Sequence, residues 1–363
     1  MNGKLGFGLM RLPRKRLGID IPQVSRMVDT FLDAGFTYFD TAFVYPGSEA
    51  AIRKALVERH PRESYTMATK LFAPMVPTEA AAKKELDTSL ERTGAGYIDY
   101  YLLHSLMGNN YKKYEKFHLW DFVQEEKAKG RIKHIGFSFH DGPELLTEIL
   151  TDHPEAEFVQ LQINYADWDN PHIRSREVYE VARSFGKEIV IMEPVKGGKL
   201  ADPPSEVKRL FTQADPRASF ASWAIRFAAS LDGILAVLSG MSNTAQMEDN
   251  VSFMKDFHPL SAEEQEIIAR ARQVFSASSE IPCTACRYCC EGCPKQIPIP
   301  DIFAVMNRRS SSGQLEAAQA EYDALVTEGH GADACIGCRK CEQVCPQHIE
   351  VADELKKCAV AFH

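Results

Sequence analysis

The chain has 363 residues, of which 45% are hydrophobic and 25% are charged, and its formal net charge is −8. This is the profile of a soluble globular protein with material for one large domain and one small domain. The negative charge argues against nucleic-acid binding, which requires a clustered basic surface, and no apolar run is long enough to cross a membrane.

The N-terminal segment, MNGKLGFGLMRLPRKRLG, places its basic residues after its apolar stretch and has no small-residue cleavage site. A secretory signal peptide has the opposite order of charge and apolarity. We therefore expect no signal peptide and a cytoplasmic protein.

Residues 1–258 alternate short apolar strands with amphipathic helices. Helices are predicted over stretches such as Pro22–Ala34, Glu79–Arg92 and Tyr114–Gly130. Eight such strand–helix units predict a closed parallel (β/α)8 barrel, a TIM barrel. An open doubly wound sheet is the alternative, but no G-x-G-x-x-G follows an early strand. The predicted strands are Leu5–Leu9, Thr37–Asp40, Tyr65–Lys70, Ile98–His104, Ile132–Ser138, Phe158–Gln162, Glu188–Met192 and Ile234–Leu238.

Polar side chains end three of these strands. Asp40, Lys70 and His104 close the second, third and fourth strands, and Tyr45 lies in the loop after Asp40. Each has an ordinary explanation, such as a helix cap, a loop aromatic, a solvated lysine or a core histidine. In a (β/α)8 barrel, however, the carboxyl ends of the strands form the active site. The four residues together therefore predict a catalytic site.

At these positions the chain resembles the aldo-keto reductases. The resemblance spans the barrel and is carried by Phe39-Asp40-Thr41-Ala42 with Tyr45, Ala68-Thr69-Lys70, Asp99-Tyr100-Tyr101-Leu102-Leu103-His104, Gly136-Phe137-Ser138, Gln162-Ile163-Asn164-Tyr165 and Asn250. It implies interconversion of a carbonyl and an alcohol with a nicotinamide cofactor.

The catalytic residues have separate expected roles. Tyr45 would supply the proton, and since a free phenol has a pKa of about 10, a nearby Lys70 ammonium is expected to lower it. Asp40 would hold Lys70 charged and oriented, and His104 would hydrogen-bond the carbonyl oxygen. A glutamate at the histidine position accompanies double-bond reduction in some members of the resembled family, so His104 favours aldehyde or ketone reduction.

The resemblance also implies a set of cofactor contacts. The chain departs from the family pattern in three ways: Met192 replaces a stacking aromatic, Phe139 replaces an asparagine, and Gly240 and Gln246 replace the basic pair that grips the 2′-phosphate. Without a guanidinium there, the sequence does not choose NADPH over NADH. The implied contacts are Gly8, Leu9, Met10, Asp40, Ser138, Gln162, Met192, Gln246 and Asn250.

Residues 259–280 are predicted to form a linker helix. Ser261 and Glu264 make a capping box for a helix that extends to about Phe275, and a Ser-Ala-Ser-Ser segment follows. Because this linker is short, we expect the C-terminal domain, residues 281–363, to pack on the barrel.

All ten cysteines lie between Cys283 and Cys358. The cytosol disfavours disulfides, so clustered cysteines there indicate metal. Eight of them form two C-x-x-C-x-x-C-x-x-x-C-P runs, in which three cysteines bind one [4Fe–4S] cluster and the fourth binds the other. The predicted ligands are Cys283, Cys286, Cys289 and Cys345 for the first cluster, and Cys335, Cys338, Cys341 and Cys293 for the second.

Paired structural zinc sites are the alternative, but zinc has no use for the third and fourth cysteines at these offsets. Cys290 and Cys358 are predicted to be spare thiols. Helices are predicted over Ile299–Met306, Glu316–Val326 and Val351–Ala361, with a Ser-Ser-Ser-Gly break between the first two. The cysteine pattern resembles bacterial two-cluster ferredoxins, and the helical spacer resembles the all-helical ferredoxin domains of redox enzymes.

Three hypotheses for the joined domains follow, because a cluster passes single electrons while nicotinamide passes a hydride. In the first, the clusters connect a carbonyl or alcohol oxidoreductase to a ferredoxin-like partner, with flavin as a converter. In the second, the barrel is an ordinary nicotinamide enzyme and the clusters are structural or oxygen-sensing. In the third, the barrel is inactive and the chain is an electron-transfer or interaction subunit. The intact set of Asp40, Tyr45, Lys70 and His104 favours an active enzyme that acts on a small molecule.

Overall fold

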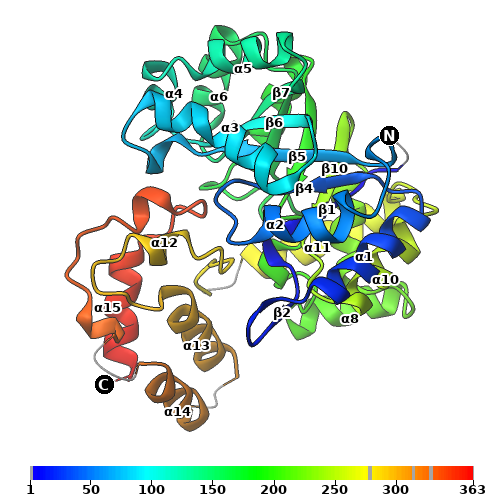
Figure 1. The fold of residues 1–363 in the computed structure, drawn as a ribbon. Helices are drawn as coiled ribbons and strands as arrows, with labels where there is room; N and C mark the ends of the chain where they lie inside the picture. The colour runs from blue at the N-terminus through cyan, green and yellow to red at the C-terminus, as the bar shows by residue number, and fades with distance from the viewer. Residues whose placement is uncertain (1–2, 277–279, 313–314, 327–329, 363) are drawn as a thin grey trace.

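The computed structural model describes residues 3–276, 280–312, 315–326 and 330–362. Eight parallel strands close into a barrel in the order β1-β10-β9-β8-β7-β6-β5-β4, as Figure 1 shows. The closed barrel confirms the (β/α)8 prediction. Its strands are β1 (Leu5–Gly8), β4 (Tyr38–Asp40), β5 (Thr66–Leu71), β6 (Ile98–Leu106), β7 (Ile132–Phe139), β8 (Phe158–Gln162), β9 (Glu188–Met192) and β10 (Ile234–Ser239).

Helices surround the barrel, and a small hairpin of β2 (Arg14–Lys15) and β3 (Gly18–Ile19) follows β1. The helix after β5 shows typical end signals: the Thr78 hydroxyl accepts from the Ala81 N–H, and Gly94 ends the helix at a φ of 66°. The helices are α1 (Ile21–Asp33), α2 (Ser48–Ile52), α3 (Glu79–Thr93), α4 (Tyr111–Lys116), α5 (Leu119–Ala128), α6 (Pro143–Asp152), α7 (Ser175–Ser184), α8 (Ser205–Ala214), α9 (Phe220–Ala229) and α10 (Thr244–Met254).

Shorter helical turns lie in the loops. Most are single 3₁₀ turns, and the segment after α2 is a short π-helix. They are η1 (Leu9–Arg11), η2 (Arg53–Val57), η3 (Arg62–Ser64), η4 (Ala73–Met75), η5 (Lys196–Gly198), η6 (Ala332–Ala334) and η7 (Glu342–Val344).

Two apolar layers hold the barrel. Alternate side chains of each strand point inward or outward, because the strand period is two residues. The outward residues pack under the helices in the main core, as Phe7, Phe39 and Met67 do. The inward residues form a separate core inside the barrel, made of Tyr38, Ala68, Leu102, Phe158, Val190, Ala236 and Leu238.

The predicted strands are confirmed to within two residues at each end. The single helix predicted over Tyr114–Gly130 is wrong. It is two helices, α4 and α5, separated at Phe117 and His118, because His118 adopts a left-handed φ of 48° that a continuous helix cannot contain.

The linker helix is α11 (Ala262–Ser276). Its capping box is reciprocal: the Ser261 N–H donates to Glu264 Oε2 at 2.8 Å, and the Glu264 N–H donates to Ser261 Oγ at 3.2 Å. The helix packs against α8 and α9 through a core that includes Phe211, Trp223 and Ile268. The serine linker predicted after this helix falls largely on residues 277–279, outside the described residues.

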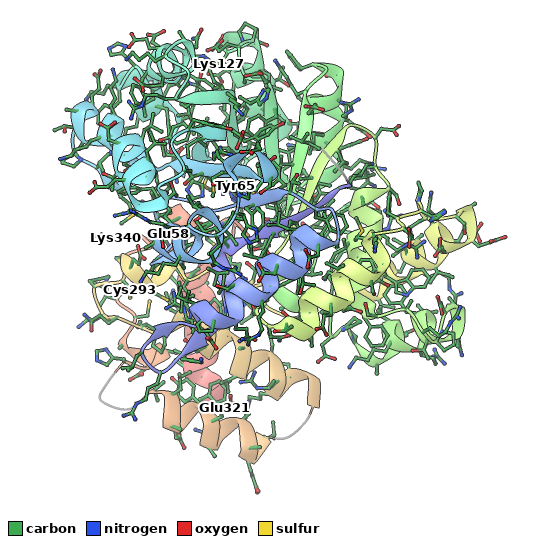
Figure 2. The ribbon with its side chains drawn as sticks, turned by 45° about the vertical axis from the view of Figure 1, so that its right-hand side comes forward. Glu58, Tyr65, Lys127, Cys293, Glu321 and Lys340 are labelled. Carbon is green, nitrogen blue, oxygen red and sulfur yellow. The ribbon has the colours of Figure 1, made fainter. Side chains whose placement is uncertain are left out.

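The C-terminal residues form a separate lobe, drawn in ochre to red in Figure 1, and Figure 2 labels Cys293, Glu321 and Lys340 within it. Its helices are α12 (Tyr288–Glu291), α13 (Ile299–Ser312), α14 (Leu315–Leu325) and α15 (Val351–Phe362). Helix α13 extends beyond its predicted end, since the serines expected to break it are helical as far as Ser312. No described helix is long and apolar enough to cross a membrane.

Candidate active site

Three of the predicted catalytic residues form one layer at the carboxyl end of the barrel. Asp40, Lys70 and His104 each lie two residues beyond a member of the inner core on their strand, at Tyr38, Ala68 and Leu102. Because the strand period is two, the three polar side chains also point inward. The register pairs Asp40 with Ala68 and Lys70 with Leu102, so these strands rise together to the same rim.

Asp40 and Lys70 form a buried ion pair. Lys70 Nζ donates to Asp40 Oδ1 at 2.5 Å and to the Thr41 carbonyl at 2.7 Å, and the Lys70 side chain is 0% exposed. Burial lowers the pKa of Lys70 and raises the pKa of Asp40, while each charge opposes the shift of the other group. The second oxygen of Asp40 is buried without a hydrogen-bond partner among the described residues. An ion pair in this position is costly to bury, which indicates a role beyond stability.

Tyr45 lies above this pair. The loop that carries it continues the pairing with β5, since the Thr41 N–H donates to the Ala68 carbonyl and the Phe43 N–H donates to the Lys70 carbonyl. The Lys70 ammonium lies 5.1 Å from the centre of the Tyr45 ring. The loop therefore holds the phenol beside the buried lysine.

His104 completes the predicted set. Its ring lies between those of Tyr45 and Phe72, with centroid distances of 5.9 and 5.4 Å. The Tyr114 hydroxyl donates to the His104 backbone carbonyl and fixes this end of β6. Burial, and then the charges of Lys70 and His140, lower the pKa of His104 well below its usual range. The imidazole is therefore neutral, with one protonated nitrogen that can donate to an oxygen.

The prediction that Lys70 lowers the pKa of Tyr45 is wrong in the environment that the described residues form. Burial raises the pKa of Tyr45 well above its usual value, and Tyr288, Asp40 and Glu193 raise it further. The desolvation of a buried phenolate outweighs the attraction of Lys70, whose charge is already matched by Asp40. Tyr45 therefore holds its proton at neutral pH.

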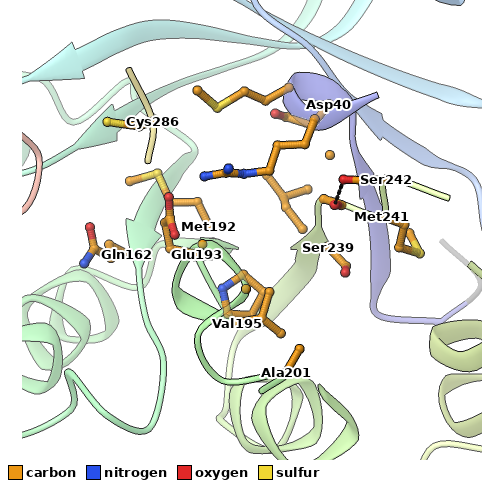
Figure 3. Close-up of a pocket in the computed structure, with 18 of the residues that line it drawn as sticks. Asp40, Gln162, Met192, Glu193, Val195, Ala201, Ser239, Met241, Ser242 and Cys286 are labelled. Atoms are coloured by element: carbon orange, nitrogen blue, oxygen red, sulfur yellow. Dashed lines mark hydrogen bonds between the residues drawn. The ribbon is translucent and has the colours of Figure 1, made fainter. Parts of the chain in front are cut away.

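A cavity of about 320 Å³ joins three of the predicted catalytic residues, Asp40, Tyr45 and His104, to α10. Figure 3 shows Cys286, Met192 and Glu193 on one side of this pocket and Met241 and Ser242 on the other. Seven predicted cofactor contacts line the cavity, together with Tyr45 and His104: Gly8, Met10, Asp40, Gln162, Met192, Gln246 and Asn250.

Two predicted cofactor contacts do not line this cavity. The Leu9 side chain lies in the main core, and its carbonyl accepts from the Ser48 hydroxyl at 3.0 Å. Ser138 is buried, and its hydroxyl accepts from the Ser105 N–H at 2.7 Å. Ser105 has a left-handed φ of 58° where the pairing of β6 with β7 shifts, which turns its N–H toward Ser138.

Gln162 lines the cavity, but its amide is already bonded. It donates to Asp167 Oδ2 at 3.2 Å and to Gln347 Oε1 at 3.1 Å, and it accepts from Gln347 Nε2 at 2.9 Å. Gln347 follows the second Cys-Pro pair and belongs to the C-terminal lobe. The amide predicted to bind the cofactor is therefore hydrogen-bonded to this lobe.

Three charged residues line the cavity but were missed by the sequence analysis, namely Glu193, Arg11 and Asp249. Glu193 is the first residue after β9, with a left-handed φ of 57° and one carboxylate oxygen buried without a partner among the described residues. The rule that selected Asp40 and His104 does not find it, because Glu193 lies one residue beyond the end of β9 and three residues beyond Val190 of the inner core. Arg11 lines the cavity from η1 and donates to the Thr284 carbonyl of the C-terminal lobe at 2.7 Å.

The C-terminal lobe forms part of the cavity wall. Cys286, Tyr288 and Pro346 line the same cavity as Tyr45. The lobe is fastened to loops at the carboxyl rim, because Lys199 Nζ donates to the Ile281 carbonyl at 2.9 Å and Asn109 Nδ2 donates to the Gln343 carbonyl at 2.7 Å. The expected packing of this domain on the barrel is thus observed, and it occurs at the active-site face.

The eight motif cysteines gather in two groups. Each group takes three members from one motif and the fourth from the other, as the predicted crossed ligation requires. One cavity of the lobe is lined by Cys283, Cys286, Cys289 and Cys345, and another by Cys293, Cys335, Cys338 and Cys341.

The donor sets suit clusters better than single zinc ions. Every cysteine is free, and Cys358 is fully buried in the core of the lobe and lines neither cavity. Four thiols line each of two cavities of the lobe, which is the arrangement that a cubane needs.

Comparison with known families agrees with both parts of the chain. The model of the aldo/keto reductase family matches residues 4–273. The model of the 4Fe-4S dicluster domain matches residues 282–350, a segment that contains all eight motif cysteines.

Relatives of known sequence match the barrel. An aldo-keto reductase of Mycolicibacterium smegmatis is 27% identical over 198 residues, which cover 52% of this chain and 65% of that protein. One from Mycobacterium sp. (strain MCS) is 30% identical over 192 residues, covering 51% and 64%. The chain thus spans just under two thirds of the length of these relatives.

Solved structures match the same fold. The holo form of an aldo-keto reductase from Bacillus halodurans superposes with a TM-score of 0.62 at 26% identity, covering 74% of this chain and 91% of that one. An aldo/keto reductase from Klebsiella pneumoniae, in complex with NADP and acetate, superposes with a TM-score of 0.61 at 17% identity, covering 76% and 92%.

Proposed function

The chain belongs to the aldo/keto reductase family and carries a 4Fe-4S domain, and from this premise we propose that it interconverts a small carbonyl compound and its alcohol with a nicotinamide cofactor, with Tyr45 as the proton donor. The observation that carries the proposal is the buried Asp40–Lys70 pair beneath Tyr45. Stability does not require such a pair, while proton transfer to an oxygen at this rim does use a fixed charge beside a phenol.

The residues present fit a nicotinamide cofactor in part. Gly8, Met10, Met192, Gln246 and Asn250 line the cavity that contains Tyr45 and would contact the bound cofactor. The Gln162 side chain hydrogen-bonds Gln347, and the Ser138 hydroxyl accepts from the Ser105 N–H. The carboxamide of a bound nicotinamide would therefore hydrogen-bond other groups. When bound, the nicotinamide supplies or accepts a hydride.

The chain's own residues divide the remaining work. His104, held neutral by burial, would donate a hydrogen bond to the carbonyl oxygen and orient it. Tyr45 would give its proton to that oxygen as the alcohol forms. Lys70, fixed by Asp40 and the Thr41 carbonyl, would stabilise the phenolate left behind. The high pKa of the resting Tyr45 means that the proton is present before each turnover.

Exchange of Tyr45 for phenylalanine tests this proposal, because the ring is kept and only the acidic hydroxyl is lost. We expect Tyr45→Phe to lower kcat for aldehyde and ketone reduction by at least about 100-fold. Nucleotide binding, followed by fluorescence, should change little. Tyr179→Phe is the matched control, since the Tyr179 hydroxyl bonds the Asp232 carbonyl and does not line the cavity. Unchanged turnover in Tyr45→Phe would remove Tyr45 from the mechanism.

One observation favours a second function, electron exchange with a one-electron partner such as a ferredoxin. Cys286, a predicted ligand of the first cluster, lines the catalytic cavity, while Cys338 of the second group is exposed. Bound clusters would pass single electrons between the exposed surface at Cys338 and the cavity at Cys286. Anaerobic titration with NADPH or NADH tests the link. Bleaching of the absorption near about 400 nm would support it, and clusters that stay oxidised during turnover would oppose it.

A further inference from the structure

Glu49 is a buried carboxylate outside the catalytic cavity that joins three elements of the barrel. It lies in the first turn of α2, and only 2% of it is exposed. The Thr69 hydroxyl on β5 donates to Glu49 Oε1 at 2.8 Å, and Arg92 Nη1 on α3 donates to Glu49 Oε2 at 3.3 Å. Glu49 does not line the cavity that contains Tyr45. A group bound in that cavity would not contact Glu49, which can act on it only through other residues.

The bond to Thr69 fastens α2 to the strand that carries Lys70. Thr69 is fully buried and directly precedes Lys70 on β5. Because side chains alternate along a strand, Thr69 points outward while Lys70 points inward. The Glu49 carboxylate therefore binds the outer face of the strand whose inner face carries the ion pair of Lys70 with Asp40.

Arg92 extends this link to the β4–α2 loop, residues 41–47. Its guanidinium donates to the Phe43 carbonyl at 3.2 Å and lies 4.5 Å from the centre of the Phe43 ring. The Phe43 N–H in turn donates to the Lys70 carbonyl at 3.2 Å. The carboxylate of Glu49 and the guanidinium of Arg92 thus complete a chain of hydrogen bonds between β5 and the middle of this loop.

A second set of hydrogen bonds closes the ends of the β4–α2 loop. Thr41 Oγ1 and Ser48 Oγ are hydrogen-bonded at 2.7 Å, and Ser48 Oγ donates to the Leu9 carbonyl at 3.0 Å. Tyr45 lies between Phe43 and Ser48, so it is held from both sides. Ser48 and Glu49 are neighbours, and the first turn of α2 therefore supplies a hydrogen bond to each set.

We propose that Glu49 is a positioning residue for the proposed carbonyl reduction. Its carboxylate holds the β4–α2 loop against β5 through Arg92 and Thr69. It thereby fixes the phenol of Tyr45 beside Lys70, whose ammonium lies 5.1 Å from the centre of the Tyr45 ring. The inference rests on the proposed function for its kinetic consequence, because the loop can be held in this way whether or not the site reduces a carbonyl.

The test is Glu49→Ala in the anaerobically purified holoprotein, with Glu126→Ala as the matched control. Glu126 is 3% exposed, accepts from Arg131 Nη1 at 2.6 Å and from Lys129 Nζ at 2.8 Å, and does not line the cavity. Loss of either carboxylate should lower the thermal unfolding midpoint, since it leaves an arginine without its partner. Loss of Glu49 alone should loosen the β4–α2 loop.

The kinetic constants separate positioning from general destabilisation. We expect kcat for carbonyl reduction to fall by at least about tenfold in Glu49→Ala, because a misplacement of about 1 Å can cost about 100-fold. KM for the nucleotide should stay within about twofold, since Glu49 does not contact the cavity. Glu49→Gln should recover most of the lost rate, because its amide oxygen can still accept from Thr69. In Glu126→Ala, kcat should match the wild type.

Hydrogen exchange gives a measurement that does not depend on turnover. Peptides covering residues 41–47 should exchange faster in Glu49→Ala than in the wild type and in Glu126→Ala, because the loop loses its link to β5. Arg92→Met is a second variant, chosen because the Arg92 side chain is 43% exposed and its replacement leaves no cavity in the core. It should accelerate exchange in the same peptides.

Unchanged exchange of residues 41–47 in both Glu49→Ala and Arg92→Met would overturn the proposal. Faster exchange without a loss of kcat would also overturn it, and so would an equal loss of kcat in Glu126→Ala. If the wild type reduces no carbonyl compound, the proposed function fails. The exchange rates alone then decide whether Glu49 holds the β4–α2 loop.

Discussion

The side-chain amides of Gln162 and Gln347 hydrogen-bond in both directions, at 3.1 and 2.9 Å, and both residues are buried. Gln162 ends β8 of the barrel, and Gln347 follows the Cys345-Pro346 pair of the iron–sulfur domain. This pair of hydrogen bonds joins the two domains beside the cavity that contains Tyr45. Asp167 accepts the remaining N–H of the Gln162 amide.

Removal of this bond should loosen the contact between the domains. In Gln347→Ala the buried amide of Gln162 loses both bonds to Gln347, which costs about 1–3 kcal/mol. We expect faster hydrogen exchange in residues 281–293, with iron content retained. Gln343→Ala is the matched control, because the Gln343 side chain is exposed and only its carbonyl contacts Asn109. Equal exchange in both variants would show that the amide pair does not hold the domains together.

Crossed ligation predicts which cluster each cysteine supports. The intact protein should hold about eight irons, and loss of one cluster should leave about four. Cys345→Ala, a change in the second motif, should remove the first cluster and the same paramagnetic signal as Cys286→Ala. Cys358→Ala should keep all the iron. If Cys345→Ala instead removes the signal that Cys338→Ala removes, the ligation is not crossed. Colourless wild-type protein with stoichiometric zinc would exclude both clusters.

Glu85 should make the barrel less stable at alkaline pH. Burial raises the pKa of Glu85 from its ordinary 4.5 to about 7. The Phe72 N–H donates to the Glu85 carboxylate at 2.7 Å and partly opposes this rise. The folded state therefore holds the proton more tightly than the unfolded chain does. Stability is lost as pH rises from 4.5 toward about 7, by an amount on the order of 3 kcal/mol.

Glu85→Gln removes this penalty, because an amide oxygen can still accept from Phe72. Its thermal unfolding midpoint should exceed that of the wild type at pH 8 and approach it near pH 5. Glu79→Gln is the control on the same helix, since Glu79 is partly exposed and pairs with Lys83 at 2.7 Å. A midpoint difference that does not change with pH would contradict the assignment.

The cofactor preference should be weak. Gln246 and Gly240 are predicted to occupy the place of the basic pair, and no lysine lines the described part of the cavity. Arg11 also lines the cavity, but its guanidinium already donates to the Thr284 carbonyl at 2.7 Å. The Gln246 side chain accepts from the Ser242 N–H at 2.7 Å. We expect kcat/KM for NADPH to exceed that for NADH by less than about tenfold, or 1.4 kcal/mol. Gln246→Arg should raise this ratio, and Gln246→Ala should not. A large preference in the wild type would mean that the phosphate site lies elsewhere.

Local pattern was sufficient to predict the barrel and the polar layer at its carboxyl rim. The period of two in each strand carries Asp40, Lys70 and His104 inward above Tyr38, Ala68 and Leu102, and this follows from sequence spacing alone. The cysteine groups follow from spacing in the same way. These features depend on residues that are close in sequence or on a symmetric fold.

The features that could not be predicted depend on contacts between distant segments. Tyr288 and Gln347 reach the barrel only because the domains dock on the active-site rim, and no local pattern encodes that docking. The pKa of Tyr45 depends on how deeply the loop is buried. The hydrogen bond from the Ser105 N–H to the Ser138 hydroxyl depends on a left-handed turn at Ser105 that has no sequence signature.

The central claim is that the cavity around Tyr45 reduces a carbonyl with a hydride from nicotinamide. The direct measurement is anaerobic turnover of a small aldehyde or ketone with NADPH that carries deuterium at both C4 positions, followed by mass spectrometry of the alcohol. We predict one deuterium on the carbinol carbon, present in the wild type and in Tyr179→Phe. An alcohol that carries only solvent hydrogen at that carbon would contradict hydride transfer, and it would favour electron delivery through the iron–sulfur domain.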